Sequence, residues 1–168
     1  LRVGLPLEAP PASLAAAPAY NKQGAFGSRP SMALVQSQAG ELTDGLRRSY
    51  RSGNLQWIRV FARRLAGLGP GLPPAGDDWL CGWLVGLRAQ HALDTDEEGP
   101  LLTVDAVGEA VIAAAEGHTT TLSLAFLRAA AVGAVPQAWH TLLDSLTDAD
   151  PMALRSSVSD VLRFGATS

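Results

Sequence analysis

Apolar residues recur every three or four positions through most of the chain after residue 40, a spacing that puts them on one face of a helix. Leu42, Leu46 and Tyr50 form the first such stripe. Gly53 interrupts the pattern, and Asn54 is a favourable N-cap for a helix that follows it. The pattern therefore predicts two consecutive helices separated by a short turn.

The same reading extends to the end of the chain. Expected helix starts are Thr103, Thr119 or Thr120, Pro136 and Asp150–Pro151, and expected ends are Gly117, Gly133 and Gly165. The helix after Thr120 is expected to turn its apolar positions inward: Leu122, Ala125, Phe126 and Ala129. About seven helices and no strong strand are predicted after residue 40, so the fold class is mainly α, a helical bundle.

Residues 1–40 have a different character, because glycine and proline interrupt every apolar run. We expect an irregular or partly β segment there, with short strands at Leu1–Leu5 and Met32–Gln36. The expected domains are thus 1–40, irregular or partly β, and 41–168, helical. Since the chain begins with Leu1 and not methionine, we also expect it to be a fragment of a longer protein.

The helix expected at about 78–93 is apolar on nearly every side: Trp79, Leu80, Cys81, Trp83, Leu84, Val85 and Leu87. A helix of that kind is normally buried all round, so it is predicted to be the centre of the bundle. Gly82 and Gly86 are four residues apart and make one face flat. Another helix is expected to approach closely there.

A loop rich in glycine and proline, residues 67–76, leads into Asp77 and Asp78. In a structural interpretation, Asp77 caps the helix and Asp78 complements its dipole. In a functional interpretation, the loop and the helix start bind a ligand, because a buried helix start leaves up to four amide donors unpaired. Gly69, Gly71 and Gly76 would turn further amides toward that ligand. The sequence leaves both interpretations open.

The functional interpretation narrows the class of ligand. Two carboxylates repel a bare phosphate, but a hard cation between Asp77, Asp78 and a phosphate would reconcile them, and Mg²⁺ is the candidate. A substrate that carries amide donors beside an anionic group would fit equally well. The loop lacks the Gly-Lys-Ser/Thr ending of a P-loop.

Composition excludes several classes of protein. The chain has 168 residues, 47% of them hydrophobic, and a net charge of −3, which suits a globular domain and does not favour a nucleic-acid partner. Its longest apolar run is far shorter than the roughly 20 residues of a membrane span. A single cysteine, Cys81, rules out an internal disulfide. A cytoplasmic location is the default expectation.

Polar residues elsewhere supply weaker candidates. His91, His118 and His140 are scattered, and none has a partner at metal-ligand spacing on its own helix. His118 alone is expected near a site, since it precedes a cluster of hydroxyls. Thr120, Thr121 and Ser123 cap a helix in one interpretation and contact ligand in the other. Arg64 enters the glycine loop, so it is the arginine proposed for anion binding.

The loop resembles a family signature. Residues 67–82 read GLGPGLPPAGDDWLCG, similar to the GxGPGLTPSGDDxLxG hallmark of a bacterial domain-of-unknown-function family. That family includes the small (H) subunit associated with oxamate carbamoyltransferase in allantoin-utilisation clusters. Thr119–Ser123 and Gly165–Ser168 add weaker similarity, and the resemblance spans roughly residues 55–168. Pro73 and Ala75 replace the hydroxyl residues of the family loop.

The resemblance implies a function in nitrogen metabolism. It implies carbamoyl transfer between oxalurate, oxamate and carbamoyl phosphate, in a complex with larger subunits and with a small anionic substrate. Asp77 and Asp78 are then the candidate catalytic or metal-binding residues. The expected substrate contacts are Gly69, Gly71, Gly76, Arg64, Thr120, Thr121 and Ser123. The alternatives are a non-catalytic assembly subunit with a structural loop and a stand-alone metal-dependent hydrolase.

Overall fold

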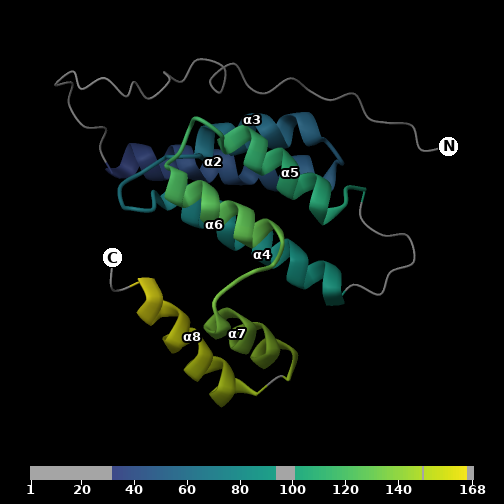
Figure 1. Ribbon diagram of the computed structural model, residues 1–168, viewed down its shortest axis with the longest axis vertical. Coiled ribbons are helices and arrows are strands. Elements are labelled where there is room, and N and C mark those ends of the chain that lie inside the picture. The colour runs from purple at the N-terminus through teal and green to yellow at the C-terminus, as the bar shows by residue number, and fades with distance from the viewer. Residues whose placement is uncertain (1–31, 94–100, 149, 166–168) are drawn as a thin grey trace. The chain divides into compact units, whose positions relative to one another are not determined.

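The computed structural model describes residues 32–93, 101–148 and 150–165. Within these ranges it contains seven helices and no strand (Figure 1). Their bounds are α2 Met32–Arg51, α3 Leu55–Leu65, α4 Ala75–Leu93, α5 Val104–Ala115, α6 Thr121–Ala131, α7 Gln137–Thr147 and α8 Pro151–Gly165. The mainly α prediction is confirmed for this part of the chain. None of these helices is both long enough and apolar enough to cross a bilayer.

The strand expected at Met32–Gln36 is wrong, because those residues form the beginning of α2. Methionine, alanine, leucine and glutamine are good helix formers, and no proline separates them from the apolar stripe that follows. The strand expected at Leu1–Leu5 lies outside the described residues. The division into 1–40 and 41–168 stays a prediction, although α2 runs without a break through residue 40.

Side-chain caps fix the starts of α3, α5 and α6 where the sequence places them. Asn54 accepts a hydrogen bond from the Trp57 amide at 3.1 Å. Thr103 and Thr120 accept in the same way from the amides of Ala106 and Ser123, each three residues further along the chain. Such a cap satisfies one of the donors that a helix start leaves unpaired. Two starts differ from the prediction: Pro136 occupies the N-cap of α7 instead of the first helical turn, and α4 begins at Ala75, ahead of the expected start at about residue 78.

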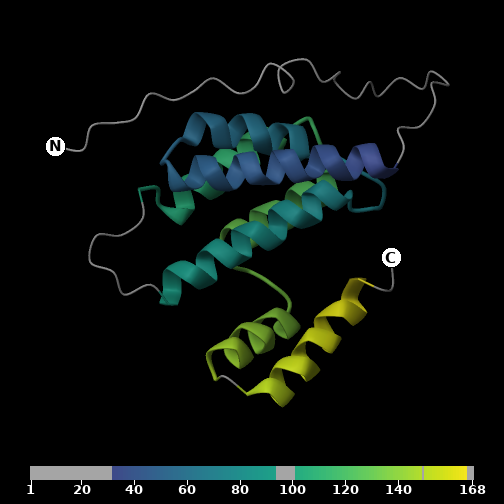
Figure 2. The same ribbon diagram turned by 180° about the vertical axis from the view of Figure 1, so that it is seen from behind.

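Helices α2 to α6 pack around a shared apolar core (Figures 1 and 2). Helix α3 packs on α2 and α5, and α6 packs on α4 and α5. Fully buried side chains from five helices meet there: Leu46, Ile58, Leu65, Leu80, Leu84, Val107, Val111 and Leu127. Helices α7 and α8 pack against each other, and the hydroxyls of Ser145 and Ser157 lie 2.7 Å apart between them.

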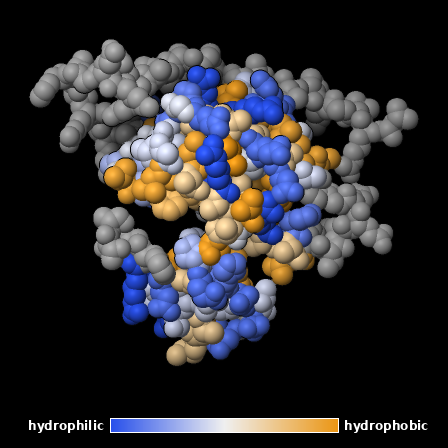
Figure 3. Space-filling model, in the orientation of Figure 1, coloured by the Kyte–Doolittle hydropathy of each residue, from blue (hydrophilic) through white to orange (hydrophobic). Residues whose placement is uncertain are grey.

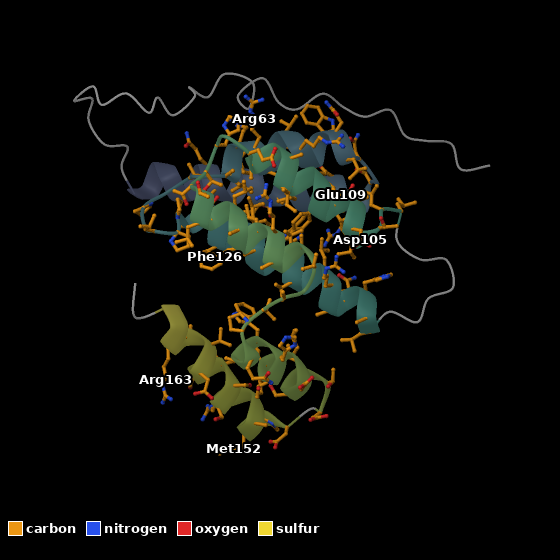
Figure 4. All side chains as sticks on the ribbon, in the orientation of Figure 1. Arg63, Asp105, Glu109, Phe126, Met152 and Arg163 are labelled. Carbon is orange, nitrogen blue, oxygen red and sulfur yellow. The ribbon has the colours of Figure 1, made fainter. Side chains whose placement is uncertain are left out.

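The inward face predicted for α6 is wrong. Its buried residues are Ser123, Leu127, Ala130 and Ala131, whereas Leu122, Ala125 and Phe126 are exposed. The small side chains let α6 come close to α5: a Cβ at Gly108 would lie 3.1 Å from that of Ala131. Phe126 consequently projects from α6 (Figure 4), and apolar side chains remain at the surface among charged ones (Figure 3).

The complete burial predicted for α4 is also wrong. Leu80, Leu84 and Leu87 are buried, but Gly86 is exposed, and no described atom lies within 4 Å of a Cβ placed at Gly82 or Gly86. The close helix approach expected at these two glycines is therefore absent from the described part of the chain. Among the described residues, helix α4 buries one side in the core and nothing covers its other side at Gly82 and Gly86.

Replacing Gly45 with alanine is expected to destabilise the protein by roughly 1–3 kcal/mol. Here α2 approaches α3 so closely that a Cβ would lie 2.5 Å from ring atoms of the buried Phe61. Gly40→Ala is the matched control: it is in the same helix with nothing described within 4 Å, and should gain up to about 1 kcal/mol in helix propensity. Urea unfolding followed by circular dichroism measures both. A gain of equal size in the two variants would contradict the packing described.

Candidate functional site

The glycine loop joins the end of α3 to the start of α4 in a tight path. Gly67, Gly69 and Gly71 have φ angles of 74°, 91° and 109°, a region that residues with a side chain rarely adopt. The peptide bond between Leu72 and Pro73 is cis. The glycines are thus needed for the path of the backbone, whatever else the loop does.

The amides at the start of α4 are occupied by the loop itself. They donate to loop carbonyls in four hydrogen bonds: Ala75 to Pro70 at 3.3 Å, Gly76 to Leu68 at 2.9 Å, Asp77 to Pro74 at 2.9 Å and Asp78 to Pro74 at 3.2 Å. The expectation that these donors await a ligand is therefore wrong. The amides of Gly69 and Gly71, in contrast, donate no hydrogen bond to any described residue.

Asp77 connects two distant parts of the chain. Its side chain is buried, with 1% of its surface exposed. One carboxylate oxygen accepts from the Gly67 amide at 2.9 Å, and the other accepts from the hydroxyl of Thr119, 42 residues later. The carboxylate thus ties the α3–α4 loop to the turn before α6, and it does not cap its own helix.

Two glycines allow the backbones to meet around this carboxylate. A Cβ at Gly67 would overlap the carbonyl oxygen of His118, and a Cβ at Gly76 would overlap that of Leu65. Both oxygens belong to the backbone, so neither can move aside cheaply. Sequence reasoning missed this role of Gly67 and Thr119, because no local pattern pairs residues so far apart.

Asp78 differs from its neighbour in being exposed at the surface. Partial burial, and secondly the charge of Asp77, raise the pKa of its carboxyl group above the ordinary value. The next turn carries Cys81, where burial and then the charges of Asp78 and Asp77 raise the pKa of the thiol to about 12. This raised pKa keeps the Cys81 thiol protonated at neutral pH.

Of the other residues predicted to contact a ligand, some belong to the helix start that Thr119 joins to the loop, and others do not. The hydrogen bond between Thr119 and Asp77 places the start of α6 next to the loop. Thr120 caps that helix, and Ser123 is buried, with 1% of its surface exposed. The hydroxyl of Thr120 also donates to that of Ser123 at 3.0 Å, so both serve the cap. Thr121 is exposed, and Arg64 is half-buried and already engaged.

The histidines add no metal site. His91 and His140 are exposed, while the backbone of His118 contacts Gly67. Among the described residues, no three histidine, cysteine or carboxylate side chains come together as metal ligands would. A cation held by Asp78 would therefore need further ligands from a substrate or from another chain.

Comparison with known proteins identifies the family. A family model described as "Oxamate carbamoyltransferase subunit AllH" matches residues 65–168, and the chain belongs to that family. The description names one subunit of an enzyme, which implies other subunits. No curated protein and no solved structure matches the chain.

Asp77→Asn is expected to lower the free energy of unfolding by roughly 1–3 kcal/mol, because one amide oxygen cannot replace two carboxylate acceptors. Thr119→Val removes the same hydroxyl bond from the other side. The two losses should therefore fall short of additivity in the double variant, which a double-mutant cycle in urea measures. Fully additive losses would mean that the two side chains do not interact.

Asp78→Asn is expected to stabilise the protein increasingly as the pH rises from about 4 to 7. A folded-state pKa above the unfolded value favours folding below the unfolded pKa, and that contribution is lost as the pH rises through the folded pKa. Asparagine does not titrate, so the variant lacks this pH-dependent contribution to stability. Melting temperatures of both proteins across this range test it, and a difference that does not change with pH would contradict the raised pKa.

Proposed function

We propose that this chain is a subunit of an oxamate carbamoyltransferase complex and that its glycine loop binds the small anionic substrate. The observation that carries the proposal is the family match, which begins at residue 65 and so includes the whole loop. The reaction moves a carbamoyl group between the nitrogen of oxamate and an oxygen of phosphate. Oxamate and oxalurate each carry a carboxylate beside amide donors, so the site needs both donors and an acceptor.

The loop offers both kinds of group within a few residues. The amides of Gly69 and Gly71 are without a described partner and can donate to a carboxylate or a phosphate. Asp78 is exposed in the first turn of the helix that follows the loop and can accept from the substrate amide. These contacts support binding of an anion with a neighbouring N–H group. If Mg²⁺ takes part, the carboxylate of Asp78 would help to hold it, and the ion would neutralise negative charge on the phosphate.

The two aspartates then have different tasks. Asp78 contacts the substrate, whereas the buried Asp77 is a positioning residue that holds the loop in place. Thr120 and Ser123 secure the start of α6 behind the loop, and Thr121 and Arg64 complete the proposed set of contacts. Gly76 serves the close approach to Leu65.

A second candidate function is a non-catalytic assembly subunit in which the loop is purely structural. The saturated amides at the start of α4 and the engaged carboxylate of Asp77 favour it. The two candidates differ in what they require of Asp78, because only substrate binding needs its carboxylate.

Asp78→Asn is expected to reduce carbamoyl transfer by the assembled complex roughly 10- to 100-fold, the usual cost of losing a hydrogen bond to a charged group. Phosphate release from carbamoyl phosphate in the presence of oxamate measures the reaction. Glu109→Gln, the same change at an exposed position of α5 (Figure 4), is the matched control and should leave the rate unchanged. A complex that assembles with Asp78→Asn and keeps full activity would establish the structural candidate instead.

A further inference from the structure

The open side of α4 forms a shallow groove beside α2. The groove has a volume of about 530 Å³, and its floor includes Trp79, Trp83, Gly86 and Gln90. Arg47 of α2 lines its edge. In Figure 2, α2 and α4 lie in front of α5 and α6.

The aromatic side chains of the groove contact one another and a neighbouring arginine. The rings of Trp79 and Trp83 are stacked, with their centroids 6.1 Å apart. The guanidinium of Arg47 lies 5.6 Å from the Trp79 ring, and Tyr50 meets Trp83 edge-on. Tryptophan, tyrosine and arginine are the residues that contribute most to protein–protein binding, and ordered side chains lose little entropy on association.

The flat part of the groove suits an α-helix. Gly82 and Gly86 are one helical turn apart and have nothing described within 4 Å of a Cβ. Another helix could therefore approach α4 at the short end of the usual 8–10 Å range. The cost of about 1 kcal/mol for each glycine within a helix is then offset by contact with that second helix.

We propose that the groove docks a helix from another subunit of the carbamoyltransferase, an inference that rests on the proposed function. The floor from Trp79 to Gln90 lies within the matched residues 65–168, and the family description is that of a subunit. The docked helix presents small or aliphatic side chains to the glycines and a carboxylate to Arg47. The present partner of Arg47 is the exposed Asp44 at 3.4 Å, a pair weak enough to exchange.

The test is Gly86→Gln in the full chain, co-expressed with the other subunits of the enzyme. The longer side chain fills the groove without disturbing the fold, so the isolated variant should melt no lower than the wild type. Its affinity for the other subunits should fall at least about tenfold, the effect of losing a central interface contact. Ala113→Gln, which adds a similar side chain at an exposed position of α5, is the control and should assemble normally.

Hydroxyl-radical footprinting read by mass spectrometry locates the interface. Oxidation of Trp79 and Trp83 should fall several-fold when the wild-type complex forms, with Trp139 as the internal reference. Normal assembly of Gly86→Gln overturns the docking proposal but leaves the proposed function intact. Protection of both tryptophans already in the isolated chain, as a monomer or as a dimer, also overturns it, because residues of this chain or a second copy then cover the groove. A wild-type chain that joins no other subunit rejects both proposals.

Discussion

The two hydrogen bonds accepted by the buried carboxylate of Asp77 determine how the described core of this protein is joined. One comes from the Gly67 amide and the other from the Thr119 hydroxyl, so a single side chain links the α3–α4 loop to the α5–α6 turn. A buried carboxylate is costly unless its oxygens are satisfied, and here each has a donor. The glycines at 67 and 76 follow from this link, since any Cβ there would overlap a backbone oxygen.

Because Asp77 forms this link, the two adjacent aspartates have different environments. Asp77 is committed to the backbone, while Asp78 remains at the surface with a raised pKa. The loop therefore need not be either structural or functional as a whole. Asp77 and Gly67 join the helices, whereas the amides of Gly69 and Gly71 have no described acceptor and would be the ones to meet the proposed substrate. The groove lies further along the same helix, so α4 would carry a proposed substrate loop at its start and a proposed subunit contact along its length.

Sequence predicted the features that depend on neighbouring residues. The caps at Asn54 and Thr103 act within three residues, and the ends of α4 and α8 lie where the pattern puts them. The sequence-based predictions were wrong where contacts between residues far apart in the chain determine the structure. The inward face of α6 is set by Ala131 packing on Gly108, not by its largest apolar residues. One of the two partners of Asp77, Thr119, is 42 residues away, and the periodicity of α4 gives no sign that the described residues leave one of its sides uncovered.

Hydrogen exchange at the Gly67 amide tests the central claim most directly. If the Asp77 carboxylate holds this amide in the folded protein, its exchange should be slow and should approach that of core amides such as that of Leu84. The Gly71 amide in the same loop, which has no described acceptor, should exchange fast and serves as the reference. Equally fast exchange at Gly67 and Gly71 would show that the link does not persist in solution and would contradict the account.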